Sequence, residues 1–259
     1  MALKRKSTYF SCLYSIMVYI FMYAPIVVVI IFSFNKGRFA TWTEFDLKWY
    51  KMLLSNTAVI NAAINSLILA ISASSLATVL GTIMAVILSR YRFMGRRLLN
   101  GSVYLLTVSP DIVMGISLLI FFILVQIPLG FTTLLISHVV LCTPFVVVTL
   151  MGRISKLDED LVAAARDLGA SESKAFFHVI LPLLLPAVAA GWLLSFTLSM
   201  DDVLISFFVA GPGFEILPLK IYSMVKLGIK PDINALSAIM FAVTVVFVLT
   251  AQFLLKTRR

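Results

Sequence analysis

The sequence predicts an all-α integral membrane protein with six transmembrane helices. Of its 259 residues, 61% are hydrophobic and only 13% are charged, which is too apolar a composition for an ordinary soluble domain. Apolar runs of about 18 residues or more recur along the chain, and a helix needs that length to cross a bilayer. We expect a single transmembrane domain over residues 1–259, with spans at roughly 10–34, 64–89, 102–126, 131–151, 183–206 and 234–255.

The distribution of the basic residues predicts the orientation of these spans in the membrane. The net charge of +9 could indicate a nucleic-acid partner, but the charges are scattered between apolar runs rather than gathered in one soluble segment. Fourteen of the 21 Lys and Arg residues lie at the two termini and in the loops after the second and fourth spans. Since basic loops stay on the cytoplasmic side, both termini are predicted to be cytoplasmic. The first span lacks a small-residue cleavage site, so we interpret it as an uncleaved span.

Two segments have compositions that suit particular positions in the membrane. The loop after the first span carries Trp42, Trp49 and Tyr50 among lysines, a pattern typical of a helix lying at the membrane surface. The second span, 64–89, is rich in Ser, Ala and Gly. Small residues let helices approach closely in lipid, so this span is expected to lie inside the bundle.

Acidic residues inside apolar spans are the main candidates for function, because a carboxylate at the bilayer centre costs about 2.5–3.5 kcal/mol on insertion scales. Asp111 follows Pro110 in the third span, where it either caps a broken helix or lines a polar pathway. Asp201 and Asp202 are adjacent in the fifth span and point about 100° apart on a helix, so they cannot share one narrow face. With Glu215 and Tyr222 just outside, these acids favour a pathway for a cationic solute.

The sequence gives little support for ATP hydrolysis, metal binding or a disulfide in this chain. The chain has no glycine-rich phosphate-binding loop ending in Gly-Lys-Ser/Thr, so it is not expected to hydrolyse ATP itself. His138 and His178 have no Cys, His or acidic residue at metal-ligand spacing, and we expect packing roles and no metal. Cys12 and Cys142 lie in apolar runs and do not suggest a disulfide.

The longest polar segment, residues 158–182, predicts two short helices joined at a glycine. Leu157, Leu161 and Ala164/Ala165 recur at helical spacing. Gly169 is a candidate helix stop, Ser171 a candidate N-cap, and Pro182 begins the next apolar run. Such a loop between two spans, residues 152–182, offers a surface to a soluble partner.

This segment, AAARDLGASESKAFFHVILP, resembles the cytoplasmic loop of permease subunits of bacterial ABC importers. In that family the loop reads Glu-Ala-Ala, three residues, Gly, nine residues, then Ile-x-Leu-Pro. Here Ala163 stands in place of the glutamate, and Glu159 or Asp160 could substitute at other helical angles. The stretches SPDIVMGISLL, PFVVVT, AGWLLSFTLSMDDV and EILPLKIYSMVK are similar to the permeases of spermidine/putrescine importers.

The resemblance implies a type I ABC importer permease fold with a cytoplasmic coupling helix. It implies a second, homologous permease subunit, two ATPase subunits that bind ATP, a periplasmic polyamine-binding protein, and the bacterial inner membrane as location. No cofactor is expected in this chain. The residues assigned to ATPase coupling are Glu159, Ala164, Ala165, Asp167, Gly169 and Pro182.

Three alternatives remain open from the sequence. One is a permease for another cationic solute, because the acids alone do not select a polyamine. A second is an ion-coupled secondary transporter that uses the intramembrane acids as a proton relay, although we find no strong internal repeat. A third, a membrane scaffold without transport, leaves the intramembrane acids unexplained.

Overall fold

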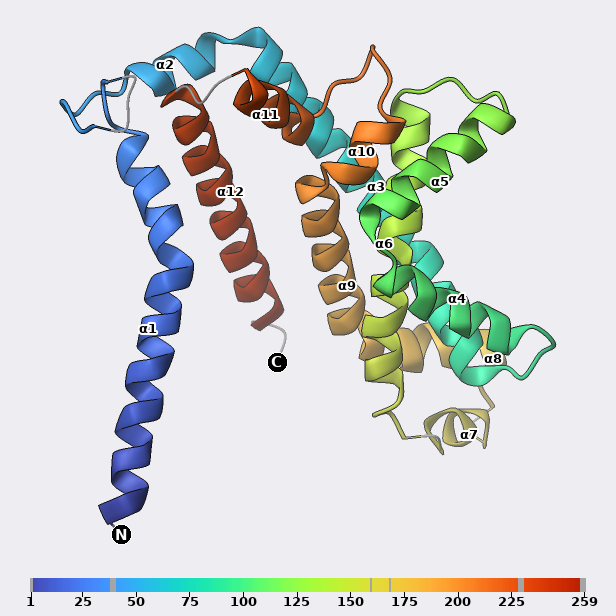
Figure 1. The fold of residues 1–259 in the computed structure, drawn as a ribbon. Helices are drawn as coiled ribbons and strands as arrows, with labels where there is room; N and C mark the ends of the chain where they lie inside the picture. Colours follow the sequence, from blue (N-terminus) through green and yellow to red (C-terminus); the bar gives the residue numbers. More distant parts are fainter. Residues whose placement is uncertain (1, 38–40, 159, 168, 228–230, 257–259) are drawn as a thin grey trace. The chain divides into compact units, whose positions relative to one another are not determined.

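The structure is a computed structural model that describes all residues except 1, 38–40, 159, 168, 228–230 and 257–259 (Figure 1). The chain divides into two compact units, one of residues 1–60 and 223–250 and the other of residues 61–222 and 251–259. Almost all of the described regular structure is helical, which confirms the predicted fold class.

The first unit contains α1 (Ala2–Phe32), α2 (Lys48–Ser55) and most of α12 (Pro231–Lys256). The buried Asn35 organises the loop between α1 and α2. The carbonyl of Asn35 accepts a hydrogen bond from Trp49 Nε1 at 2.8 Å, and its side-chain oxygen accepts one from the Thr43 amide at 2.9 Å. Trp49 is therefore buried within this unit, and the location of its helix at the membrane surface stays a prediction.

A salt bridge closes the same loop from outside. Lys36 Nζ lies 2.7 Å from a carboxylate oxygen of Glu44. The hydrogen bond to Glu44 raises the pKa of Lys36 from its ordinary value, and the negative charge of that carboxylate acts in the same direction. Both side chains are more than half exposed, so this pair adds little to stability.

The second unit holds the remaining helices. They are α3 (Thr57–Arg90, entering from the first unit), α4 (Arg96–Val108), α5 (Asp111–Leu124), α6 (Phe131–Ile154), α7 (Asp160–Asp167), α8 (Glu172–Ala175), a π-helical turn (Phe176–Ile180), α9 (Leu181–Asp201), α10 (Leu204–Val209) and α11 (Leu217–Lys226), whose last residues belong to the first unit.

Four described helical stretches are long and apolar enough to cross a membrane: Cys12–Phe32, Thr57–Arg90, Phe131–Ile154 and Glu172–Asp201. A fifth span is available if α4 and α5 are counted as one broken span. The described apolar part of α12, Pro231–Val246, is shorter. The sixth predicted span, at 234–255, therefore stays a prediction.

Two predicted spans are interrupted. The third, 102–126, is not a straight helix, because α4 and α5 meet at an angle of 117°. Ser109 precedes a proline and is extended (ψ 135°), as its neighbour requires, so the helix stops before Pro110. The fifth, 183–206, breaks after Asp201, where Asp202 is extended (ψ 123°) before α10 begins.

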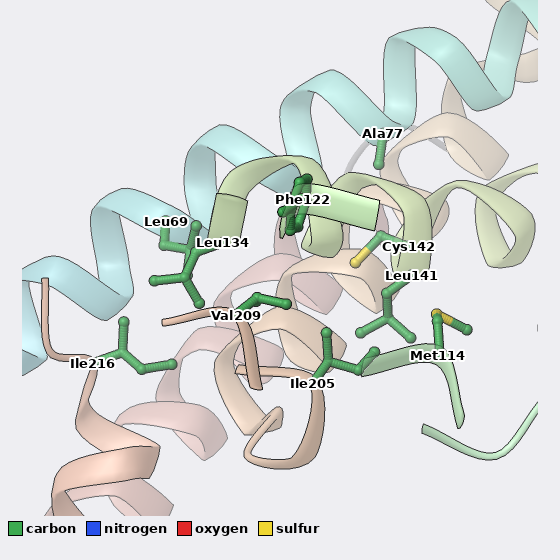
Figure 2. Packing of buried hydrophobic residues seen from close by; sticks show 10 residues of the cluster. All are labelled: Leu69, Ala77, Met114, Phe122, Leu134, Leu141, Cys142, Ile205, Val209 and Ile216. Atoms are coloured by element: carbon green, nitrogen blue, oxygen red, sulfur yellow. The ribbon is translucent and has the colours of Figure 1, made fainter. Parts of the chain in front are cut away.

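Helix α6 is the centre of the second unit, where it packs along α9 and also contacts α4, α5 and α10. Figure 2 shows one of its two apolar clusters, in which side chains from α3, α5, α6 and α10 meet Ile216. Phe122 and Leu134 are fully buried within this cluster. The second cluster joins α3, α4, α6 and α9 around Val146 and Leu184.

Helix α3 uses small residues to approach α6, as its composition predicted. A Cβ placed on Gly81 would lie 2.7 Å from Val146 Cβ and 3.2 Å from the Thr143 carbonyl oxygen. Ala73 and Ala77 on the same helix are fully buried. Close contact between backbones replaces the hydrophobic effect as the main attraction between helices in lipid, so this crossing helps to fix α3 on α6.

We predict that Gly81→Ala destabilises the protein by about 1–3 kcal/mol, since the added methyl overpacks against Val146 in α6. The matched control is Gly101→Ala in α4, where a Cβ meets nothing within 4 Å and alanine raises helix propensity. Thermal unfolding of both purified variants in the same detergent checks this. Equal midpoints for the two variants would show that α3 does not depend on this contact.

Candidate functional site

The break between α9 and α10 is built on the carboxylate of Asp202. This carboxylate accepts hydrogen bonds from the backbone amides of Ile205 (3.2 Å) and Ser206 (2.8 Å) and from the Ser206 hydroxyl (2.7 Å). The first amides of a helix have no partner within the helix, and here the side chain of Asp202 supplies one. Asp202 is 8% exposed, so the break is stabilised inside the protein rather than by water.

His138 of α6 extends this arrangement into a buried network, which we call the His138 network: His138, Ser199, Asp202 and Ser206. The ring Nδ1 lies 2.7 Å from the Ser199 hydroxyl and Nε2 lies 2.9 Å from the Ser206 hydroxyl. Nε2 is also 3.6 Å from a carboxylate oxygen of Asp202. His138 and Ser206 are fully buried, and the network therefore joins α6 to both α9 and α10.

The direction of these hydrogen bonds follows from the Asp202 carboxylate oxygens, which act as acceptors. The Ser206 hydroxyl donates to Asp202, so its oxygen is left to accept from Nε2–H of His138. In a neutral imidazole the other nitrogen then accepts, and the Ser199 hydroxyl donates to it. Every ring nitrogen has a partner, as a buried polar network requires.

Asp201 differs from Asp202 in its surroundings although the two residues are adjacent in the chain. It is the last residue of α9, it is exposed, and its side chain makes no hydrogen bond or ion pair with another residue of the described chain. The sequence anticipated that the two acids would face different surroundings. In the structure the side chain of Asp202 accepts from the first amides of α10, and the carboxylate of Asp201 is left accessible.

Asp111 lies at the other helix break. It is the first residue of α5, directly after Pro110, and its side chain is exposed. Gly115, four residues later and on the same helix face, packs against α10, with a Cβ position 3.2 Å from Ile205 Cα. The packing of α5 on α10 thus brings the two breaks into the same part of the second unit.

Glu215 and Tyr222 have partners of their own. Lys220 Nζ lies 2.9 Å from the carboxylate of Glu215, which is therefore neutralised locally. The backbone carbonyl of Glu215 accepts a hydrogen bond from the Asn65 side chain of α3 at 3.0 Å. The ring of Tyr222 packs edge-on against Phe207 of α10, with centroids 5.9 Å apart.

The polar segment after α6 forms the predicted pair of short helices, α7 and α8, at the far end of α6 (Figure 1). Gly169 has φ 83° and the Ala170 amide donates to the Ala165 carbonyl at 3.0 Å across it, which confirms the predicted stop. The Ser171 hydroxyl accepts from the Lys174 amide, which confirms the predicted N-cap.

The residues assigned to coupling fall on different surfaces of this segment. Ala164, Asp167 and Gly169 are exposed, whereas Ala165 is buried. Pro182 is exposed near the start of α9. Glu159 lies outside the described residues. Their role in binding a partner stays a prediction.

Comparison with known proteins identifies the family. Residues 77–257 match the family described as binding-protein-dependent transport system inner membrane component. The chain belongs to this family. It is 49% identical over 242 residues to the spermidine/putrescine transport system permease protein PotC of Escherichia coli K12, covering 93% of this chain and 92% of that protein. It is 40% identical over 230 residues to the putrescine transport system permease protein PotI of the same organism, covering 85% and 81%.

Solved structures agree on the fold of this inner-membrane transport component. A bacterial alginate ABC transporter in complex with its alginate-bound periplasmic protein superposes with a TM-score of 0.75 at 18% identity, covering 96% of this chain and 93% of that chain. The methionine ABC transporter MetNI superposes with a TM-score of 0.66 at 14% identity, covering 77% and 95%. These likenesses confirm the ABC importer permease fold and, at such identities, nothing finer.

His138 is the residue of this transport component that sequence reasoning undervalued. A lone histidine in an apolar span suggested a packing role, and packing is part of what it does. Its partners could have been suspected from Ser199 and Ser206, two hydroxyls that flank the acid pair in the same span. No described group of three or more His, Cys, Asp or Glu residues is arranged to hold a metal ion.

We predict that Asp202→Asn lowers the free energy of unfolding by about 1–3 kcal/mol, because the asparagine NH₂ cannot accept from the amide and hydroxyl donors around it. The control is Asp201→Asn, which removes the same charge from an exposed side chain and should leave the midpoint unchanged. Thermal unfolding of the two purified variants measures the difference, at about 2–4 °C per kcal/mol. If Asp201→Asn is the more damaging change, the assignment of roles to the two acids is wrong.

Proposed function

We propose that the chain is the transmembrane permease subunit of an ATP-driven polyamine importer, which forms half of a pathway for spermidine or putrescine. The relatives at 49% and 40% identity are named as spermidine/putrescine and putrescine permeases, which supports the solute class. The observation that carries the proposal is the pair of exposed carboxylates, Asp111 and Asp201, at the helix breaks that precede α5 and α10, two helices that pack on each other.

Polyamines are ammonium groups separated by alkyl chains, and this site offers complements to both. Asp111 and Asp201 attract the ammonium groups by direct charge complementarity. Phe207 and Tyr222, which are in ring contact, can accept an ammonium over a ring face or contact the alkyl chain. Asp202 serves the solute only indirectly in this proposal, by holding the break that positions Asp201.

The energy comes from other subunits, because the sequence contains no phosphate-binding loop motif. We assign ATP to two partner ATPase subunits and docking on them to the segment of α7 and α8. The exposed face with Ala164 and Asp167 is the contact surface. A homologous second permease and a periplasmic polyamine-binding protein complete the importer, with both termini of this chain in the cytoplasm.

We predict that Asp201→Asn and Asp111→Asn each reduce spermidine uptake by about tenfold or more. Each removes a charge-assisted contact to an ammonium, worth about 1.5–3 kcal/mol, and about 1.4 kcal/mol corresponds to a factor of ten. The measurement is initial uptake of radiolabelled spermidine by the complete importer in proteoliposomes with internal ATP.

The control is Glu44→Gln, which removes an exposed carboxylate of the first unit that is paired with Lys36. It should transport normally. Full uptake by both aspartate variants, at equal amounts of assembled importer, would reject the acid-lined pathway. Uptake driven by an imposed pH gradient without any ATPase subunit would instead favour a secondary transporter.

A second prediction concerns Gly169. A Cβ there meets nothing within 4 Å, so space is not limiting, but φ 83° is a conformation that β-branched residues rarely adopt. We expect Gly169→Val to distort the joint between α7 and α8 and to abolish ATPase recruitment or coupling. Co-purification of the ATPase subunits and spermidine-stimulated ATP hydrolysis measure these two effects.

The matched variant at this position is Gly169→Asn. Asparagine tolerates positive φ better than other non-glycine residues, so it should keep most of the recruitment that valine loses. Normal recruitment and normal transport in Gly169→Val would exclude a coupling role for this joint. Equal loss in both variants would mean that any side chain is harmful and that a partner surface, rather than φ, excludes it.

A further inference from the structure

The turn between α3 and α4 concentrates positive charge in the second unit. Arg90 ends α3, Arg92 lies in the turn, and Arg96 and Arg97 begin α4. The chain reverses at Gly95, whose φ of 97° is in the left-handed region. The turn therefore places several guanidinium groups around the amino end of a 13-residue helix, an end that itself favours negative charge.

Three of these four arginines line a cavity of about 420 Å³, whose lining residues are Arg92, Phe93, Gly95, Arg96, Arg97 and Asn100. No carboxylate is among the lining residues. The three arginine side chains make no hydrogen bond or ion pair with any residue that the structure describes. The cavity thus has uncompensated positive charge, with donors that match the oxygens of a phosphate.

A neighbouring cavity of about 620 Å³ provides a comparison within the same structure. It shares Arg92 and Arg96, but Asp158 and Glu172 also line it. The Tyr91 hydroxyl lies 3.5 Å from the carboxylate of Glu172. With Arg90 the larger cavity has three arginines against two carboxylates, whereas the smaller one has three arginines and no carboxylate, so the smaller one is the better place for an anion.

Apolar side chains flank the charged turn. Met94 is fully exposed and Leu98 is 75% exposed, and both lie between or next to lining residues. Leu99 is also exposed, whereas Val103 of the same helix is buried against the second unit. Charged groups for a headgroup beside apolar groups for acyl chains are what a protein needs at the membrane boundary.

We propose that the cavity lined by Arg92, Arg96 and Arg97 binds the phosphodiester headgroup of an anionic phospholipid, such as phosphatidylglycerol, from the cytoplasmic leaflet. The side of the membrane rests on the topology in the proposed function. The lipid would anchor the turn, and through it the amino end of α4, at the membrane surface.

The test uses the complete importer purified in a mild detergent and exchanged with defined lipids. Native mass spectrometry measures phosphatidylglycerol retained in competition with phosphatidylcholine. Arg92→Gln/Arg96→Gln should lower retention by about tenfold, the factor that corresponds to about 1.4 kcal/mol. The control, Lys48→Gln/Lys51→Gln, removes the same charge from α2 and should retain lipid as the unmodified protein does.

A second variant guards against faulty insertion, because arginines in this loop also set topology. Arg92→Lys/Arg96→Lys keeps the charge but loses the bidentate geometry, so it should insert normally and still lower retention. Topology is checked separately by labelling Met94→Cys, in a Cys12→Ser background, with a membrane-impermeant thiol reagent added to one side. Labelling from outside would refute the assigned leaflet.

Three results would overturn the proposal. The first is unchanged phosphatidylglycerol retention in both arginine variants. The second is displacement of the lipid by free glycerol phosphate at equal concentration, which would indicate a soluble phosphate site. The third is loss of ATPase subunits with lipid retained, which would make the turn a protein contact. None of these measurements involves polyamine uptake, so failure here is distinct from failure of the proposed function.

Discussion

The buried carboxylate of Asp202 is the group on which the second unit most depends. A helix that ends inside a membrane protein leaves backbone amides and carbonyls without water to satisfy them, and each such group costs several kcal/mol. The Asp202 carboxylate accepts hydrogen bonds from the amides at the start of α10. Within the His138 network, the Ser206 hydroxyl beside this carboxylate is hydrogen-bonded in turn to His138. The interruption of α9 costs little free energy because its polar groups are hydrogen-bonded within the protein.

Helix α9 and the helical residues before it connect the segment of α7 and α8 with the acid pair Asp201 and Asp202. Residues from Glu172 to Asp201 form one helical run of 30 residues, interrupted only by the π-helical turn at Phe176–Ile180. At about 1.5 Å per residue such a run is about 45 Å long, enough to connect the short helices after α6 with the acid pair. A displacement at one end can therefore reach the other without a change of secondary structure, and π-helical turns often mark functional sites.

Much of this could be predicted from the sequence, because the strongest signals were local. Apolar length predicted the helices that are long enough to cross a membrane. Gly169 and Ser171 predicted the joint, and the small residues of α3 predicted its close approach to another helix. Pro110 indicated a break between α4 and α5, but the angle between these two helices depends on packing against α6 and α10. Which of Asp201 and Asp202 is buried depends on His138, 63 and 64 residues earlier in the chain, and no local pattern contains that information.

The His138 network also has a consequence for how such a protein can diverge. Replacing any one of its four members leaves at least one buried polar atom without its partner, whereas replacing both partners of a hydrogen bond with apolar groups of similar shape can be nearly neutral. Single steps away from the network are therefore selected against, and a lineage that loses it must lose several members at nearly the same time. The four residues are expected to be inherited together, as one character rather than four.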